Sequence, residues 1–278
     1  MKKIIILITL LLFITACFST SQDGMNKGVP RGLDINILQP TEKGVFEGVS
    51  FSPLLTVENN ADCEITNGNL RVRDLLNEDR SAVDEEKTID LYVGEKKTEI
   101  FSEAMYGGDI STEFNNLNVN FLAEAEYSCS LPLDISICAR SFSSESNNGE
   151  GLCKGRETIT SGLKSAPITV TKIVKELSWP GDDTVNIDLE IYLEKMPEGN
   201  IEGDFNINLN FGSAETGCED LDNLKWESGS TNTKKVINCW VLLENVEDVV
   251  MDNLQIDLSY NYKQIESISF PVRNNKNL

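Results

Sequence analysis

Residues 185–191 read VNIDLEI, and this stretch decides the fold class of the chain. Apolar residues occupy every second position, and Asn186, Asp188 and Glu190 fill the positions between them. A period of two residues places the apolar side chains on one face of a β-strand and the polar ones on the other. The stretch therefore predicts a strand with one face in a core and one face in water. Residues 205–211, FNINLNF, repeat this pattern with asparagine at each polar position.

The same alternation extends over most of the chain. Turn-forming residues separate the apolar segments, and no segment keeps a helical period. Pro132 interrupts one of these segments, so we expect two strands there. Many short strands at fairly regular spacing are typical of a β-sandwich, and we therefore predict an all-β fold. The predicted strands are 33–38, 51–58, 69–74, 88–93, 98–101, 119–129, 135–139, 168–177, 185–191, 205–211, 236–243, 254–262 and 267–272.

Two sandwich domains in tandem are predicted from the chain length and from a break in the pattern. Residues 161–167, SGLKSAP, have the composition of a linker, and the alternation restarts at Ile168. We place domain one at 33–160 and domain two at 168–278. Each has a usual size for one domain, so we expect the two to fold separately.

The first 17 residues, MKKIIILITLLLFITAC, have the layout of a cleaved export signal. Lys2 and Lys3 precede an apolar run that is too short to span a bilayer as a mature helix. Its ending resembles a lipobox, in which Cys17 is acylated and becomes the new N-terminus. Residues 18–32 are small and polar and are expected to form a flexible tether. A secreted protein with an unmodified Cys17 is the alternative.

Cysteine usage agrees with export. The chain has seven cysteines, and six remain when Cys17 is set aside. An even number of cysteines in an exported protein favours disulfides, and no Cys-x-x-Cys spacing supports a zinc site. We therefore predict an extracytoplasmic protein with three disulfides that is held at the membrane by its lipid.

Composition excludes several classes of function. The chain has no histidine, which removes nucleophile systems with a histidine base and all histidine zinc sites. Its net charge of −21 opposes binding to nucleic acid phosphates. An anionic membrane repels a protein with this charge, so we expect the lipid on Cys17 to be its contact with the membrane. No phosphate-binding loop is present in the sequence, and we expect no cofactor.

Two acidic clusters offer oxygen ligands of the kind that Ca²⁺ prefers. One comprises Glu219, Asp220 and Asp222, and the other comprises Asp182 and Asp183. Neither cluster matches a defined calcium loop, and solvated turns on an acidic protein are the alternative. We therefore expect no resident metal, and these five carboxylates are the candidates if a metal binds.

Two tryptophans of domain two receive different predictions. Trp226 lies in a polar stretch and is a candidate binding residue, although a tryptophan that covers the core edge also fits this context. Trp240 lies next to Cys239 in an apolar strand and is predicted to belong to the core.

Residues 125–129, AEYSC, have the form A-x-Y-x-C. In immunoglobulin-like sandwiches a tyrosine two residues before the second cysteine forms the tyrosine corner, and Cys63 lies at a separation from Cys129 that is compatible with pairing. No tryptophan lies between these cysteines, so the packing tryptophan of a true immunoglobulin domain is missing. Domain one therefore resembles an Ig-like sandwich in architecture.

The whole chain resembles two-module, disulfide-stapled surface lipoproteins whose modules are similar to adhesion-related Ig-like domains. This resemblance implies a cell-surface protein and assigns no functional residue. The segments that carry it are 57–60 (VENN), 127–129 (YSC), 137–138 (IC), 161–162 (SG) and 166–167 (AP).

Pairing within each domain predicts the disulfides Cys63–Cys129, Cys138–Cys153 and Cys218–Cys239. The last of these follows if the domains are independent, since domain two has only two cysteines. The four cysteines of domain one allow three pairings, so two other arrangements stay open there.

Location and composition together predict a non-catalytic module that presents loops or sheet edges to another protein or to a cell-envelope polymer. One alternative is an anchored hydrolase or substrate-binding component, which needs carboxylates that converge in a pocket. The other is a structural envelope subunit that assembles with copies of itself through exposed edge strands.

Overall fold

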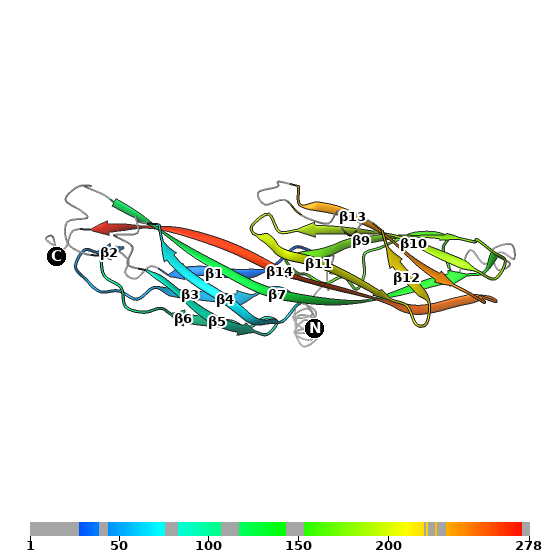
Figure 1. Cartoon of the computed structure of the whole chain (residues 1–278), viewed down its shortest axis with the longest axis horizontal. Coiled ribbons are helices and arrows are strands. Elements are labelled where there is room, and N and C mark those ends of the chain that lie inside the picture. Colours follow the sequence, from blue (N-terminus) through cyan, green and yellow to red (C-terminus); the bar gives the residue numbers. More distant parts are fainter. Residues whose placement is uncertain are drawn as a thin grey trace, which may run out of the picture.

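The computed structural model of the chain describes residues 28–38, 44–75, 83–106, 117–142, 153–219, 221, 226 and 232–273. These residues form fourteen β-strands in three sheets, which confirms the predicted all-β fold. The molecule is elongated, and the sheets are arranged along its length (Figure 1). No helix in the described ranges is long and apolar enough to cross a membrane.

Two very long strands run through the whole molecule. β7 (Leu117–Arg140) has 24 residues and β14 (Val249–Arg273) has 25 residues. They pair antiparallel from Leu117 opposite Val272 to Arg140 opposite Val249. Strands in globular proteins usually have about five or six residues, whereas this pair, at about 3.3 Å per residue, is roughly 75 Å long. The pair is therefore the axis of the fold (Figure 1).

β7 and β14 lie at the centre of a six-stranded sheet. Its other strands are β2 (Val45–Phe46), β4 (Ile65–Asp74), β5 (Asp84–Leu91) and β11 (Asn200–Asn210). The order across this long sheet is β11-β14-β7-β4-β5, and β2 joins the end of β14 in parallel.

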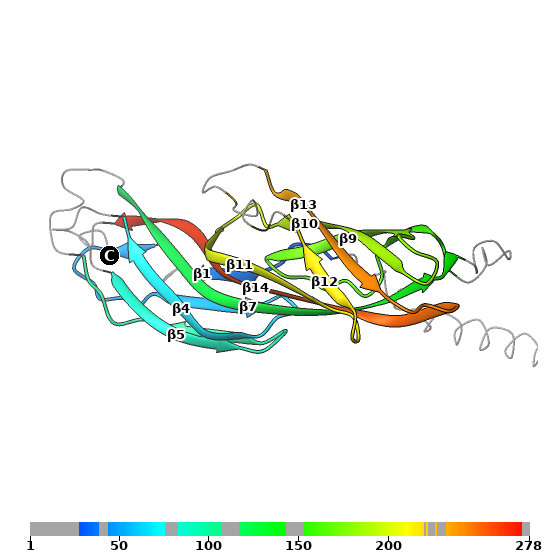
Figure 2. The same cartoon turned by 45° about the vertical axis from the view of Figure 1, so that its right-hand side comes forward.

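Two smaller sheets cover opposite ends of the long sheet and define two lobes (Figures 1 and 2). The sheet of lobe one has the order β1-β3-β6 and consists of β1 (Leu33–Leu38), β3 (Leu54–Asn59) and β6 (Lys96–Ile100). The sheet of lobe two has the order β12-β13-β10-β9-β8. Its strands are β8 (Arg156–Ile159), β9 (Ile168–Ser178), β10 (Val185–Lys195), β12 (Glu215–Cys218) and β13 (Lys234–Leu243).

Alternation along β7 explains why both small sheets lie on one face of the long sheet. Every odd-numbered residue from Val119 to Ala139 is buried, and most even-numbered residues between them are exposed. One unbroken apolar face therefore runs through both lobes. A small sheet packed on each end of this face makes two sandwiches that share one continuous core.

Three tyrosines fill the core between the two lobes, a region that we call the waist. The ring of Tyr262 lies between those of Tyr127 and Tyr260, with centroid separations of 6.0 and 6.5 Å. The Tyr260 hydroxyl accepts a hydrogen bond from Ile168 N–H at 2.9 Å and donates one to the Ile168 carbonyl at 3.0 Å. Burial raises the pKa of all three tyrosines, so their hydroxyls remain protonated donors.

The segment 161–167, predicted to be a linker, is packed against the waist. Leu163 and Ala166 are buried. The N–H of Ser165 donates to Asp62 Oδ2, and the N–H of Asp62 donates to the Ser165 carbonyl, both at 2.6 Å. Backbone pairing and burial therefore fix this segment to lobe one.

The lobes also differ from the predicted domains 33–160 and 168–278. β7 starts in lobe one and ends in lobe two, whereas β14 starts in lobe two and ends in lobe one. Each lobe thus contains strands from both halves of the sequence. The physical reason is that β7 and β14 are each long enough to take part in both sandwiches. The linker-like composition of residues 161–167 therefore does not mark a boundary between two separate sets of sheets.

Pro132 does not interrupt β7, contrary to the prediction. It lies opposite Asp257 within the continuous pair with β14. β4 pairs with β7 only from Phe121 to Glu126, so the other side of β7 beyond Glu126 is an edge within the described residues. Proline lacks an N–H and is tolerated where that side of the strand has no neighbour.

The structure contains the three predicted disulfides, Cys63–Cys129, Cys138–Cys153 and Cys218–Cys239. The first lies at the waist, the second joins the end of β7 to the residues before β8, and the third links opposed positions of β12 and β13. Three disulfides indicate an oxidising, extracytoplasmic environment.

Tyr127 does not form the hydrogen bond expected of a tyrosine corner, in which the hydroxyl bonds to backbone a few residues upstream. Its hydroxyl donates to Gln264 Oε1 at 3.4 Å, and Gln264 Nε2 donates to the Leu33 carbonyl at 2.6 Å. Tyr127 therefore connects β7, β14 and the start of β1 at the waist.

Lys175 closes one edge of the lobe-two sandwich. Its side chain is fully buried and reaches from β9 to β7, where Nζ donates to the Cys138 carbonyl at 2.7 Å. The ammonium also lies 3.0 Å from Glu157 Oε1. Trp179 Nε1, just after β9, donates to the Arg140 carbonyl at 2.9 Å. Side chains from the facing sheet thus satisfy two carbonyls at the end of β7.

The shared long strands predict that residues 168–278 do not fold alone, because β14 loses the partner with which it pairs over 24 positions. Residues 117–278 restore β7 and should fold as lobe two when Cys129→Ser removes the unpaired thiol. Urea unfolding followed by circular dichroism checks this. We expect a cooperative transition for the longer fragment only, and a similar transition for 168–278 would show that β7 is dispensable.

Replacing Lys175 with methionine should lower the free energy of unfolding by about 2–3 kcal/mol. Methionine keeps the apolar volume but removes the hydrogen bond to Cys138 and the ion pair with Glu157. Breaking a buried pair costs about 3–5 kcal/mol, and the partly exposed Glu157 side chain reduces that cost. Lys172→Met, on the same strand but half-buried, is the control and should change the free energy by less than about 1 kcal/mol. Equal urea midpoints for the two variants would refute the role given to Lys175.

Candidate binding groove on lobe two

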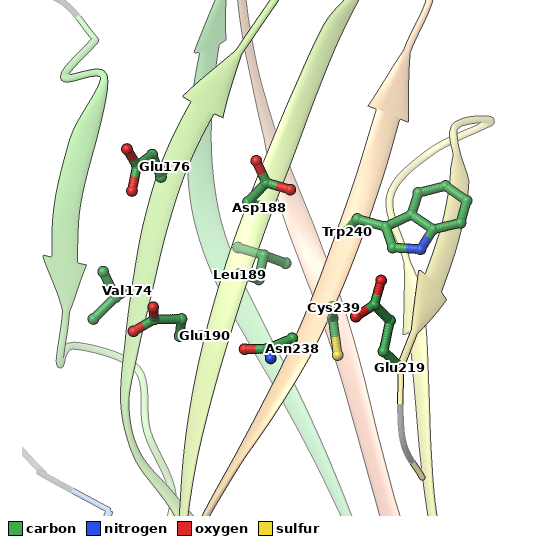
Figure 3. A pocket seen from close by; sticks show the side chains of 9 residues that line it. All are labelled: Val174, Glu176, Asp188, Leu189, Glu190, Glu219, Asn238, Cys239 and Trp240. Atoms are coloured by element: carbon green, nitrogen blue, oxygen red, sulfur yellow. The ribbon is translucent and has the colours of Figure 1, made fainter.

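The outer face of the lobe-two sheet carries a shallow groove with a cavity volume of about 260 Å³. It lies on the side of the sheet away from the core, so most of its lining comes from the polar positions of the alternation. We call it the Trp240 groove and show its side chains in Figure 3. The lining residues are Val174, Glu176, Asp188, Leu189, Glu190, Glu219, Asn238, Cys239 and Trp240.

Strand register brings these residues together. Glu176 on β9 lies opposite Asp188 on β10, and Asp188 lies opposite Trp240 on β13. A second row two residues along the same three strands consists of Val174, Glu190 and Asn238. Carboxylates from two strands therefore face the same groove as the indole.

The indole of Trp240 lies across β12 (Figure 3). Its register partner on that strand is Gly217. A Cβ atom on Gly217 would come within 2.9 Å of Trp240 Cζ2 and 3.0 Å of Cε2, which is closer than non-bonded carbons approach. The lack of a side chain at Gly217 therefore lets the indole pack on the β12 backbone. This packing holds Trp240 half-buried at one end of the groove.

Neighbouring side chains orient two of the carboxylates. Arg156 Nη1 lies 3.1 Å from Glu176 Oε2. Asp188 accepts hydrogen bonds from Ser178 Oγ at 3.1 Å and from Asn186 Nδ2 at 2.7 Å. These contacts fix the side chains while leaving carboxylate lone pairs for a ligand.

Glu190 belongs to a contact that already holds an ammonium on this face. Its Oε2 accepts a hydrogen bond from the Tyr192 hydroxyl at 2.9 Å, and this bond raises the pKa of Tyr192. The Lys172 ammonium lies 3.8 Å from the centroid of the Tyr192 ring. An aromatic ring next to a carboxylate therefore binds a cation within the protein itself.

Glu219 and Asn238 lie near the Trp240 end of the groove. The N–H of Glu219 donates to the Asn238 carbonyl at 2.9 Å, which places the two residues side by side. Both side chains are exposed, and neither has an ionic or hydrogen-bonding partner among the described residues. They are therefore free to bind a ligand beside the indole.

The structure agrees with the core-edge alternative for Trp226 and contradicts the core prediction for Trp240. Trp226, the candidate binding residue, is only 8% exposed and packs against the Phe205 ring at 5.9 Å between centroids, as a tryptophan that covers the core edge does. Trp240, predicted to be in the core, lies on the outer face. The reason is that Cys239 points inward to its disulfide, so the next residue along the strand points outward.

The predicted acidic residues do not gather into a metal site within the described part of the chain. Asp182 and Asp183 are exposed in the turn between β9 and β10, whereas Glu219 follows β12 and lines the Trp240 groove. Among the described members, Asp182 and Asp183 therefore lie apart from Glu219.

Three further predicted positions, Cys17, Asp220 and Asp222, lie outside the described residues. Acylation of Cys17 stays a prediction from the sequence, as does calcium binding at the two aspartates. Residues 18–27 of the predicted tether 18–32 are also outside the described part, which starts at Gly28.

No protein-family model matches the chain, and no curated protein matches it either. The functional inference therefore depends on the geometry of the chain itself.

Replacing Gly217 with alanine should displace the Trp240 indole, because the new Cβ would lie too close to two ring carbons. Overpacking of this kind costs about 1–3 kcal/mol, and we expect a lower urea midpoint with altered tryptophan fluorescence. Gly155→Ala is the control, since a Cβ there meets no atom within 4 Å. Unchanged fluorescence in Gly217→Ala would mean that the indole does not depend on this packing.

Proposed function

We propose that the chain is a membrane-anchored, extracytoplasmic binding module without catalytic activity, and that the Trp240 groove binds a basic segment of a partner protein. The observation that carries this proposal is the indole packed over Gly217 beside exposed carboxylates. The other parts of the proposal rest on the sequence of the N-terminal segment and on the disulfides.

The chemistry of the groove favours an organic cation. A lysine ammonium or arginine guanidinium is attracted to the face of a tryptophan ring and to nearby carboxylates. Glu219 and Asp188 flank Trp240, and the contact between Lys172 and Tyr192 on the same sheet is an intramolecular example. The net charge of −21 adds long-range attraction for a basic partner.

The two alternatives fit the groove less well. A glycoside hydrolase needs a buried carboxylic acid as proton donor, whereas Glu176 and Asp188 are exposed and Glu176 is paired with Arg156. Self-assembly through this face would bring together two copies of the same acidic surface, which repel each other. An unlike, basic partner is therefore the better occupant.

Binding of hexalysine to the purified full chain tests the proposal. We expect Trp240→Ala to weaken binding by about tenfold, the upper part of the range for a cation on a tryptophan face. Asp188→Asn should also weaken binding and reduce its dependence on salt. Isothermal titration at two salt concentrations measures both effects.

Asp257→Asn is the matched control, because it removes the same charge from the long sheet and leaves the groove intact. Equal losses in Asp188→Asn and Asp257→Asn, with no effect of Trp240→Ala, would mean that the peptide binds to the acidic surface in general and would overturn the assignment of the groove. Chitosan oligosaccharide is a second probe. Tighter binding of this polymer than of hexalysine would replace the protein partner with a cationic envelope polymer.

A further inference from the structure

The turn that connects β5 in the long sheet to β6 in the small sheet of lobe one has an exposed apolar tip. Tyr92 is 70% exposed and Val93 is 52% exposed. Gly94 follows with a φ of 73°, and the N–H of Glu95 donates to the Tyr92 carbonyl at 3.0 Å. This is a tight turn in which glycine takes the position that needs a positive φ. The turn therefore pushes an aromatic and a branched aliphatic side chain into solvent.

The polar backbone groups of the tip are bonded within the protein. Tyr92 N–H donates to Glu95 Oε2 at 2.8 Å, and Gly94 N–H donates to the Asn59 carbonyl at 2.9 Å. The N–H of Asn59 donates in turn to the Glu95 carbonyl at 2.9 Å, and Asn59 Nδ2 donates to the Tyr92 carbonyl at 3.3 Å. Backbone groups that are already bonded enter an apolar environment at a lower desolvation cost than free ones.

The tip lies at the waist, next to the place where the described chain begins. Asn59 holds the tip, and the adjacent Asn60 N–H donates to the Gly32 carbonyl at 3.1 Å. Arg31 N–H donates to the Ala166 carbonyl at 2.9 Å, so residues 31–32 are fixed to the waist as well. In both overall views the β5–β6 turn reaches the middle of the long axis (Figures 1 and 2).

The length of the N-terminal segment limits how far the waist can be from a lipid on Cys17. Eleven peptide units join Cys17 to Gly28, and a fully extended chain of that length spans at most about 40 Å. An acylated Cys17 therefore keeps the waist, and the tip with it, close to the bilayer. Anchoring therefore raises the effective concentration of the tip at the bilayer surface, which favours a second contact there.

The two lysines that follow the tip are paired with carboxylates, whereas the Glu95 carboxylate accepts the hydrogen bond from the Tyr92 N–H. Lys96 Nζ lies 3.1 Å from Glu58, and Lys97 Nζ lies 2.8 Å from Glu99. Pairing reduces the repulsion that the acidic chain as a whole has for an anionic surface. Tyrosine also prefers the interface between headgroups and acyl chains, where its ring is buried and its hydroxyl stays wet.

From these observations we infer that the tip formed by Tyr92 and Val93 is a membrane-contact site that inserts into the bilayer interface beside the lipid anchor. The contact holds the elongated molecule at the bilayer by its waist. This inference rests on the proposed anchoring through Cys17. The ligand is the lipid interface itself and needs no specific headgroup.

Fluorescence quenching in vesicles tests the inference. Full-length lipidated Tyr92→Trp is reconstituted into vesicles of phosphatidylcholine with or without brominated acyl chains. We expect brominated lipid to reduce the fluorescence of the added indole by about twofold, since interfacial tryptophan lies within reach of the acyl chains. Val93→Trp repeats the test at the neighbouring position, in case the first variant does not fold.

Met251→Trp is the matched control. Met251 is 68% exposed, but it lies about 35 Å along β14 from Tyr262 at the waist, so its replacement should not be quenched. If the protein stays on the vesicles but neither tip variant is quenched, the inference is overturned. Equal quenching of the tip variants and of the Met251→Trp control also overturns it. Both results leave the proposed anchor in place. Protein that does not stay on vesicles in flotation overturns the proposed anchor, and the inference fails with it.

Discussion

The antiparallel pairing of β7 with β14 is the constraint on which the rest of the structure depends. A strand buries one face, and β7 presents a single apolar face from Val119 to Ala139. That face needs cover over its whole length, which one small sheet cannot supply, so two sheets pack on it end to end. The chain therefore enters at the waist, builds most of lobe one, crosses to lobe two on β7 and returns on β14. Neither lobe can be completed from one half of the sequence.

The sequence predicts those features of the fold that depend on neighbouring residues, and it misses those that depend on contacts between distant residues. Alternation is local, so the residues 185–191 correctly predict a half-buried strand, and the all-β class follows from such segments. The three cysteine pairs were predicted correctly, although count and spacing alone left two other arrangements open for Cys63, Cys129, Cys138 and Cys153. The partner of a strand is not encoded in its period, so the shared long strands were missed. Pro132 was misread because its tolerance depends on which side of β7 is unpaired.

The side chains of the Trp240 groove show the same limit, because their contacts with residues distant in the sequence are not predicted. A stricter use of alternation finds the orientation of Trp240, since a buried disulfide at Cys239 sends the next residue outward. The packing of its indole on Gly217 needs the register between β12 and β13, which the sequence does not supply. Trp226 lies in a polar stretch, yet Phe205 on an edge strand gives it a buried surface to cover. Local polarity therefore misplaces a side chain whose contact is distant in sequence.

The position of the tether changes what the groove can reach. A rod attached at one end carries its far end away from the membrane, whereas a rod attached at the waist keeps both ends near it. The described chain begins at the waist, where the Arg31 N–H donates to the Ala166 carbonyl and the Asn60 N–H donates to the Gly32 carbonyl. With a lipid on Cys17, lobe two therefore stays within a few tens of Å of the bilayer. A partner that brings a basic segment to Trp240 then has to approach the same membrane face, which favours another envelope protein over a surface on a neighbouring cell.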